Sequence, residues 1–429
     1  MIDNSTESLS SERVARLVQF RKELSQELND ILSYWIKNTY DALNGGFIGR
    51  IDENNVAYPN APKGAVLNSR ILWSFSAAYA LTNDPEHLHL ARIAFNYFQA
   101  YFIDKEFGGV YWTVDPQGKP LDTKKQVYAL AFAIYGCATY YEVSKSEAAK
   151  EIAIGLFNTI EEHSFDTVNT GYLEAFTRDW QPLDDLRLSA KDANEKKTMN
   201  THLHVLEAYT SLYRIWPNEK LKGRVDTLLD NFKQHIVDGS GHLRLFFDER
   251  WNAKADTVSF GHDIEASWLL FDAAELINQA SGLADVKRLS LHIASAAQEG
   301  LDSDGGLWYE YENFNQHLIK EKHWWVQAEA MVGFFNAWQL SGDGAYLEKS
   351  VDAWEFVKKS LKDQVHGEWF WGITSTGSVM EKQDKVGVWK CPYHNSRACI
   401  EIIHRINKML NQDRLSNISN GVNHQFKLK

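Results

Sequence analysis

The chain has 429 residues, of which 44% are hydrophobic, 13% aromatic and 24% charged, and its formal net charge is −12. This hydrophobic fraction allows a substantial core and excludes a largely disordered chain. The negative charge and the lack of a basic block argue against nucleic acid and anionic membranes as partners.

Cysteine usage and the N-terminus indicate the compartment. The 3 cysteines are too few for a disulfide framework and include no Cys-x-x-Cys pair. The first residues lack the apolar core of a signal peptide, and no run reaches the roughly 18 apolar residues of a membrane-spanning helix. We therefore expect a cytoplasmic protein.

A glycine motif recurs along the chain, each copy followed by alternating aromatic or apolar residues, as in Gly108-Gly109-Val110-Tyr111-Trp112. Turn residues such as 113–118 come next, which predicts a short strand entering a turn. The six anchoring glycines are 63, 62, 70, 65 and 61 residues apart: Gly46, Gly109, Gly171, Gly241, Gly306 and Gly367.

Two kinds of helix alternate between these motifs. The helix before a motif is amphipathic, as in 148–162 and 345–361, whereas the helix after it is apolar nearly all round, as in 71–80 and 128–135. A helix that is apolar on every side is buried on every side.

Six such repeats predict twelve helices in an all-α fold, an (α/α)6 barrel of six outer and six inner helices with short β-hairpins over the cavity. An open solenoid is the alternative, but it would need polar terminal repeats, and the last helix, 393–403, still resembles an inner one. We expect one catalytic domain over 9–411, a loose N-terminus (1–8) and a polar C-terminal tail (412–429).

In a closed ring the first turns of the six inner helices converge on one cavity. Histidines recur in four of these turns, although the whole chain has only 15. In chain order the turns are Asn68-Ser69-Arg70, Gln126-Val127-Tyr128, Asn200-Thr201-His202-Leu203-His204, Gly261-His262-Asp263-Ile264-Glu265, His323-Trp324-Trp325-Val326-Gln327 and Pro392-Tyr393-His394.

The sixth turn shows how such a position suits a base. Pro392 fits the first helical position, so His394 lies near the positive end of the helix dipole, which favours a neutral imidazole. Trp389, just before the helix, could form a flat apolar wall against a ligand. A lone histidine at such a position more often only packs, and the recurrence in other repeats is what favours a functional interpretation.

Three chemistries compete for this cavity. Metal binding is disfavoured, because His202 and His204 at i,i+2 point apart on a helix and cysteine ligands at suitable spacing are missing. Glycoside hydrolysis needs two carboxylates across the scissile bond. Candidate carboxylates exist (Asp192, Glu265, Glu368), but histidines dominate the inner turns.

The third chemistry is proton transfer at a carbon next to a carbonyl. Two histidines on opposite faces of a substrate could remove and return a proton near neutral pH. Arg70 and the helix dipoles would stabilise the intervening oxyanion. This chemistry needs no cofactor, and no glycine-rich phosphate cradle suggests one. We interpret His202, His323 and His366 as structural, and Cys391 and Cys399 as packing residues.

Six segments resemble the cellobiose 2-epimerases of the N-acylglucosamine 2-epimerase superfamily. The resemblance spans roughly residues 10 to 410 and rests on NSRILWSFSAAY, QVYALAFAIY, NTHLHVLEAY, GHDIEASWLL, KHWWVQAEA and WKCPYHNSRAC. It implies an (α/α)6 barrel and reversible, cofactor-independent epimerisation at C2 of the reducing-end sugar of β-1,4-linked disaccharides. Cellobiose would give glucosyl-mannose, and lactose would give epilactose.

The resemblance also implies roles for individual residues. His262 and His394 match the two general acid/base histidines, and Arg70 matches the arginine that holds the reacting oxygens. His204 matches a third essential histidine, for ring opening or for orienting O1 and O5. Further matches are sugar contacts (Tyr128, Asn200, Glu265), aromatic walls (Trp325, Trp389) and a loop position near the distal sugar (Asp192).

The runner-up is a relative that isomerises free mannose to fructose with similar histidines; an (α/α)6 glycoside hydrolase is a weaker alternative. The expected partner is a disaccharide substrate, with the chain a monomer or weak homodimer.

Overall fold

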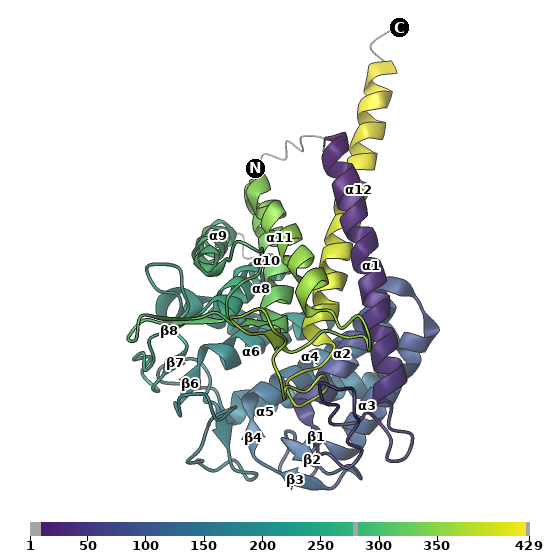
Figure 1. Ribbon diagram of the computed structural model, residues 1–429. Coiled ribbons are helices and arrows are strands. Elements are labelled where there is room, and N and C mark those ends of the chain that lie inside the picture. Colours follow the sequence, from purple (N-terminus) through teal and green to yellow (C-terminus); the bar gives the residue numbers. More distant parts are fainter. Residues whose placement is uncertain (1–9, 278–281, 426–429) are drawn as a thin grey trace.

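The computed structural model describes residues 10–277 and 282–425, which contain twelve α-helices joined by loops with short strands (Figure 1). Six of these helices form an inner ring. Each contacts the next, and the last contacts the first, so the ring closes and the predicted barrel is confirmed. The inner helices are α2 (Ala65–Thr82), α4 (Val127–Ser144), α6 (Met199–Ile215), α8 (Phe260–Leu276), α10 (Trp324–Ser341) and α12 (Tyr393–Gln425).

Each outer helix packs against the inner helix of its own hairpin, and α1 packs against α12. The outer helices are α1 (Ser11–Thr39), α3 (Pro85–Tyr101), α5 (Glu147–His163), α7 (Glu219–Asn231), α9 (Leu283–Ala297) and α11 (Gly344–Phe356). Short helical turns extend three of them: η1 (Phe232–Ile236), η2 (Gln298–Gly300) and η3 (Val357–Leu361).

The pattern of apolar residues explains the two rings. In α4 every residue from Val127 to Ile134 is buried, whereas α5 buries only one stripe, which includes Ala149, Ala153 and Leu156. A helix with one apolar stripe can pack on the outside of the inner ring. It cannot belong to the inner ring, where a helix is buried on every side.

Short antiparallel strands link neighbouring repeats at the end where the inner helices begin. The strand before each of α2, α4, α6, α8 and α10 pairs with a strand from the following repeat. An isolated bridge between Ile51 and Val386 connects the first and last repeats. The five ladders are β1 (Lys63–Gly64) with β2 (Thr113–Val114) and β3 (Pro120–Asp122); β4 (Lys125–Gln126) with β5 (Ala175–Phe176); β6 (Lys197–Thr198) with β7 (Phe246–Phe247); β8 (Thr257–Ser259) with β9 (Glu310–Glu312) and β10 (His317–Ile319); and β11 (Lys322–His323) with β12 (Gly372–Ile373).

The glycine motifs form the tight turns between outer helices and strands. Gly46 has φ +66°, and a Cβ there would lie 2.6 Å from a ring carbon of Tyr97. Both the backbone conformation and the close approach of the ring therefore require glycine.

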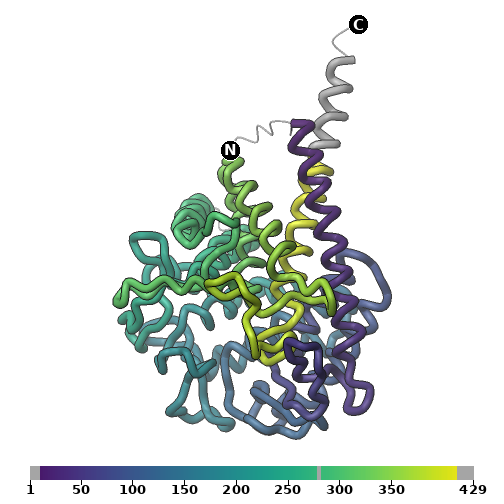
Figure 2. The backbone as a smooth tube through the Cα atoms, viewed as in Figure 1, coloured from purple at the N-terminus to yellow at the C-terminus, as the bar shows by residue number. Residues whose placement is uncertain are grey.

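The first and last helices lie side by side, with α1 in purple along α12 in yellow (Figures 1 and 2). α12 continues to Gln425, so the segment predicted as a C-terminal tail (412–429) is helical as far as that residue. The predicted loose N-terminus (1–8) lies outside the described residues, and the division into one domain and two terminal segments stays a prediction.

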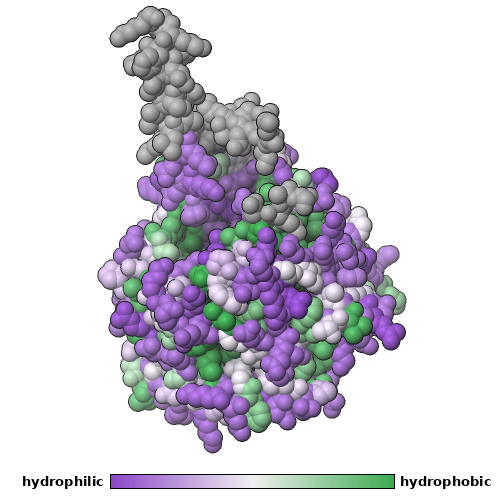
Figure 3. Space-filling view, turned by 180° about the vertical axis from the view of Figure 1, so that it is seen from behind, coloured by the Kyte–Doolittle hydropathy of each residue, from purple (hydrophilic) through white to green (hydrophobic). Residues whose placement is uncertain are grey.

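The outer surface is mainly polar. On the face shown in Figure 3 hydrophilic residues predominate, and hydrophobic residues form small separate groups. Among the described residues, no helix has both the length and the apolar character needed to cross a membrane.

Candidate active site

The first turns of the inner helices open into a cavity of about 630 Å³. All ten residues predicted for the site line it, although they come from distant parts of the chain: Arg70, Tyr128, Asp192, Asn200, His204, His262, Glu265, Trp325, Trp389 and His394. Closure of the ring brings them together.

His262 and His394 both lie close to Trp325. The centroid of the Trp325 ring is 4.7 Å from that of His262 and 5.8 Å from that of His394. In each histidine the Nδ1 atom has a partner, the Ser259 hydroxyl at 2.8 Å for His262 and a carboxylate oxygen of Glu329 at 2.7 Å for His394. Nε2 is therefore the nitrogen left to exchange a proton with a ligand.

Burial keeps both imidazoles neutral near pH 7. Burial lowers the pKa of His262 to about 3 and that of His394 to about 3, although Glu329 acts in the opposite direction on His394. Because a carboxylate only accepts, His394 donates Nδ1–H to Glu329 and keeps a lone pair on Nε2. Such a nitrogen can act as a base.

His204 repeats this arrangement on α6. Its Nδ1 lies 2.9 Å from a carboxylate oxygen of Glu207, one helical turn further on, and its ring packs against Tyr128 and Phe132. Burial lowers the pKa of His204, so its Nε2 is also available as an acceptor.

Arg70 is only 3% exposed and contacts neutral groups. It donates to the Tyr128 hydroxyl at 2.8 Å and to the Trp389 carbonyl at 3.4 Å. Its guanidinium carbon lies 4.1 Å from the centroid of Phe132 and 4.8 Å from that of Tyr393. Aromatic faces thus take much of the place that water or a carboxylate would have around a cation.

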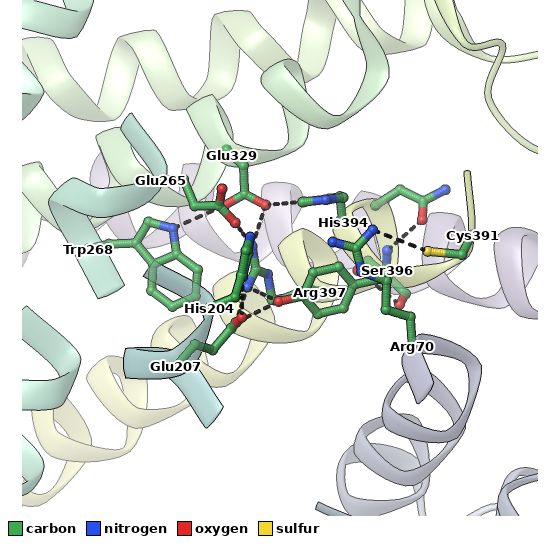
Figure 4. A network of polar contacts seen from close by, with 12 residues as sticks. Arg70, His204, Glu207, Glu265, Trp268, Glu329, Cys391, His394, Ser396 and Arg397 are labelled. Atoms are coloured by element: carbon green, nitrogen blue, oxygen red, sulfur yellow. Dashed lines mark hydrogen bonds and ion pairs between the residues drawn. The ribbon is translucent and has the colours of Figure 1, made fainter. Parts of the chain in front are cut away.

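A buried ion-pair network, missed by the sequence analysis, lies beside the histidines (Figure 4). Arg397 donates to Glu265 at 2.6 Å, to Glu329 at 2.6 Å and to Glu207. The three glutamates come from α8, α10 and α6. The network therefore connects four inner helices through one guanidinium and fixes the two carboxylates that hold His204 and His394.

The acids of this network differ in protonation. Burial raises the pKa of Glu265 to about 8, helped by the neighbouring Glu329. Burial would also raise the pKa of Glu329, but Arg397 and His394 lower it to about 2. Glu329 is therefore the anion that faces His394, and Glu265 is the more difficult of the two acids to ionise.

The third repeat contributes a second buried acid that the sequence analysis missed. Glu174 accepts hydrogen bonds from the Thr198 amide and hydroxyl and from the Thr201 hydroxyl, at 2.8–3.0 Å. It lines the cavity next to Asn200, whose buried Oδ1 has no partner within the described residues. These bonds fix the start of α6, which carries Asn200 and His204.

Asp192 and Trp389 form parts of the cavity wall further from the histidines. Asp192 accepts from the Ser189 amide at 2.8 Å, and burial raises its pKa. The Trp389 ring lies 5.8 Å from Trp112 and 6.0 Å from Tyr128. Aromatic faces of this kind suit the C–H faces of sugars.

Two of the three carboxylates weighed for glycoside hydrolysis, Glu265 and Glu368, are bound to basic side chains. Glu368 is absent from the cavity lining and instead binds Lys390, Asn395 and the Trp35 indole. Glu265 is bonded to Arg397. Glu265 and Glu368 are thus both bound to other buried groups and are not two free acids facing each other across the cavity.

Three side chains have ligand atoms within 4.8 Å of one another and could surround a cation: Glu265, Glu329 and His394. Arg397 already supplies a positive charge to the same two carboxylates. An internal ion pair therefore accounts for this cluster.

The other predicted structural histidines differ in position. His202 is fully buried; its Nε2 accepts from the Tyr172 amide at 2.9 Å, and its Nδ1 donates to the Thr198 carbonyl at 2.6 Å. His366 is exposed. His323 lines the cavity, with its Nε2 2.9 Å from Glu321 and its ring stacked on Tyr309. Cys391 and Cys399 are both buried.

Comparison with known proteins agrees with this arrangement. Residues 46–398 match the family model described as N-acylglucosamine 2-epimerase (GlcNAc 2-epimerase). A cellobiose 2-epimerase of Bacteroides fragilis is 49% identical over 385 residues, which cover 89% of this chain and 98% of the relative. The solved structure of cellobiose 2-epimerase from Bacillus thermoamylovorans B4167 superposes with a TM-score of 0.87 at 39% identity, over 90% of this chain and 99% of that chain.

A more distant relative acts on a different kind of sugar. A D-mannose isomerase of Marinomonas mediterranea is 24% identical over 396 residues, which cover 89% of this chain and 96% of the relative. The sequence identity to the cellobiose 2-epimerase of Bacteroides fragilis is about twice the identity to this isomerase, over the same share of the chain.

Proposed function

The chain belongs to the N-acylglucosamine 2-epimerase family and is an isomerase, and we propose that it is a 2-epimerase of β-1,4-linked disaccharides. It interconverts glucose and mannose at the reducing end, turning cellobiose into glucosyl-mannose and lactose into epilactose, without a cofactor. The observation that carries the proposal is the pair of neutral histidines, His262 and His394, both close to Trp325 in one cavity.

The reaction starts with opening of the sugar ring, because only the open aldose has a carbonyl next to C2. His204 is suited to this step, since Glu207 holds its Nδ1–H and leaves Nε2 to exchange a proton with the ring or anomeric oxygen. Trp325 and Trp389 hold the sugar between aromatic surfaces, and Tyr128, Asn200 and Glu265 bind its hydroxyl groups.

One of His262 and His394 then removes the C2 proton, which gives a cis-enediolate. Rotation about the C2–C3 bond presents the opposite face of C2, and the other histidine delivers a proton. A positioned acid or base contributes about 10²- to 10⁴-fold to such a step.

Arg70 stabilises the enediolate. Its guanidinium is buried and its partners are neutral, so negative charge that develops on O1 and O2 interacts with it strongly in a medium of low polarity. The interaction is stronger in the transition state than with the neutral sugar, which is the condition for catalysis.

A single labelling experiment tests the proposal. Purified protein is incubated with lactose, cellobiose or mannose in D2O, and the products are separated by sugar chromatography and analysed by NMR. We expect epilactose and glucosyl-mannose with deuterium at C2, because the second histidine exchanges with solvent.

The same experiment distinguishes the alternative. An aldose–ketose isomerase would return the proton to C1, so mannose would give fructose labelled at C1. A C2 epimer without deuterium at C2 would contradict the proton-transfer mechanism, and conversion of mannose but of neither disaccharide would contradict the proposed substrate.

A further inference from the structure

Arg70 lines the cavity, and no carboxylate among the described residues is bonded to it. Its hydrogen-bond partners within the described residues are neutral: the Tyr128 hydroxyl, the Trp389 carbonyl and, at 4.0 Å, the Cys391 sulfur. Its Nε has no partner. A buried charge without an opposite charge in contact is costly, and the contacts with aromatic rings offset only part of this cost.

The acidic groups nearby do not neutralise Arg70. Glu207 and Glu329 are bonded to Arg397, which balances part of their charge. Glu265, the acid that acts electrostatically on Arg70, accepts a hydrogen bond from Arg397 at 2.6 Å, and burial raises its pKa. The histidines in the same cavity are neutral. Arg70 therefore faces the cavity as a cation to which none of the described carboxylates is bonded.

The ligand class that fits an unpaired guanidinium is a carboxylate, whose two coplanar oxygens accept from neighbouring N–H donors. The Tyr128 hydroxyl accepts from Arg70, so its own proton is free to be donated to the same ligand. The inference rests on the proposed function in one respect: epimerisation at C2 places C1 and C2 of the reducing-end sugar near Arg70.

From these observations we infer that the cavity binds disaccharide aldonates, sugars oxidised to a carboxylate at C1, in preference to neutral open-chain sugars. The C1 carboxylate takes the position of the enediolate oxygens beside Arg70, and the distal sugar keeps its place. Oxidised disaccharides are then competitive inhibitors, and whatever oxidises the substrate at C1 also slows its epimerisation.

Two ligands of equal size test this inference by direct binding. Lactobionate carries a carboxylate at C1, and lactitol carries a neutral CH2OH there, while the galactosyl part is the same. Isothermal titration calorimetry is performed with each ligand on the whole protein at pH 7. A charge-assisted hydrogen bond contributes about 1.5–3 kcal/mol, so we expect lactobionate to bind roughly 10- to 100-fold more tightly.

Matched arginine variants locate the origin of the preference. Arg70→Met should reduce the affinity ratio to about one, whereas Arg187→Met should leave it unchanged, because Arg187 also lines the cavity but is paired with Asp185 at 2.8 Å. Lactitol binding and the melting temperature check that Arg70→Met is folded. The lactobionate-to-lactitol affinity ratio of the wild type tests the inference even if that variant does not fold.

The two proposals fail separately. Equal or weaker binding of lactobionate to the wild type would overturn the inference even if lactose is epimerised. Retention of the preference in Arg70→Met, or its loss in Arg187→Met, would overturn the assignment to Arg70. Preferred lactobionate binding without turnover of any disaccharide would leave this inference intact and overturn the proposed function.

Discussion

His262 and His394 differ in the group that holds their Nδ1 atoms, a neutral hydroxyl from Ser259 and a charged carboxylate from Glu329. A carboxylate stabilises an imidazolium more than a hydroxyl does. His394 is therefore the histidine better suited to hold a proton during the reaction, and His262 the better suited to remain neutral.

Replacing His394 by Ala should lower kcat for lactose epimerisation by about 10²- to 10⁴-fold, because one acid/base group is lost. The fold should persist, since Arg397 still holds Glu329. Initial rates and melting temperature measure the two effects. His366→Ala is the matched control, because His366 is exposed and absent from the cavity lining. A wild-type rate in His394→Ala would contradict the assigned role.

Stability should fall between neutral and acidic pH because of buried histidines such as His202. Burial lowers its folded-state pKa to about 3, below the unfolded value of about 6.5, so its contribution is complete above pH 6.5 and is lost as the pH falls towards 3. In this window each such group lowers the free energy of unfolding by about 1.4 kcal/mol for every pH unit that the pH falls.

His202→Gln removes one of these groups at a position outside the cavity lining. Between pH 7 and pH 5 the wild type should lose about 2 kcal/mol more unfolding free energy than this variant. Urea unfolding at both pH values measures the difference, and parallel losses in the two proteins would contradict the linkage to His202.

At the scale of elements, ion pairs between a buried lysine and an aspartate join the end of an outer helix to the strand before the next inner helix. Four of them use the lysine two positions before the inner helix: Lys63–Asp41, Lys125–Asp104, Lys197–Asp166 and Lys322–Asp302. Each aspartate also accepts backbone N–H groups of its own turn, as Asp41 does from Leu43 and Asn44. The pairs hold the hairpins in place over the cavity.

Lys63→Met should cost about 3–5 kcal/mol of unfolding free energy, because it leaves the Asp41 carboxylate buried without its cation. The double variant Lys63→Met/Asp41→Asn should recover part of this loss. Lys124→Met is the control: its pair with Asp122 is long, at 3.9 Å, and partly exposed, so at most about 1 kcal/mol is expected. Equal losses in Lys63→Met and Lys124→Met, measured by urea unfolding, would contradict a special role for the buried pair.

At the scale of the whole molecule, the last inner helix is covered by a helix outside the family match. The match begins at residue 46, whereas α1 ends at Thr39 and covers α12 with buried residues such as Leu28, Ile31 and Trp35. The Trp35 indole also donates to Glu368, under the last hairpin. Without α1, the inner helix that carries His394 would lack its outer layer.

Two truncations test which ends the fold needs. Removing residues 1–39 should prevent cooperative folding, because the apolar face of α12 would be exposed to water. Removing residues 412–429 should leave the melting temperature and the epimerase rate near wild-type values, since the family match ends at residue 398. Thermal unfolding followed by circular dichroism measures both; loss of folding in the second truncation would contradict the prediction that this segment is a dispensable tail.

The sequence by itself determined the architecture and the position of the cavity. Spacing of the glycine motifs and the alternation of striped and wholly apolar helices are local properties, and both can be read without knowing which segments meet. They were sufficient to predict a closed ring, and the first turns of its inner helices contain most of the residues that line the cavity, including His204, His262 and His394.

Only the tertiary structure decided how these residues are held and charged. Arg397 is 190, 132 and 68 residues from Glu207, Glu265 and Glu329, so no local pattern links them. The Glu329 contact to His394 and the neutral partners of Arg70 depend on which helix faces meet after closure. Burial then sets the protonation states, because the cost of charge depends on the surroundings in three dimensions and not on neighbours in sequence.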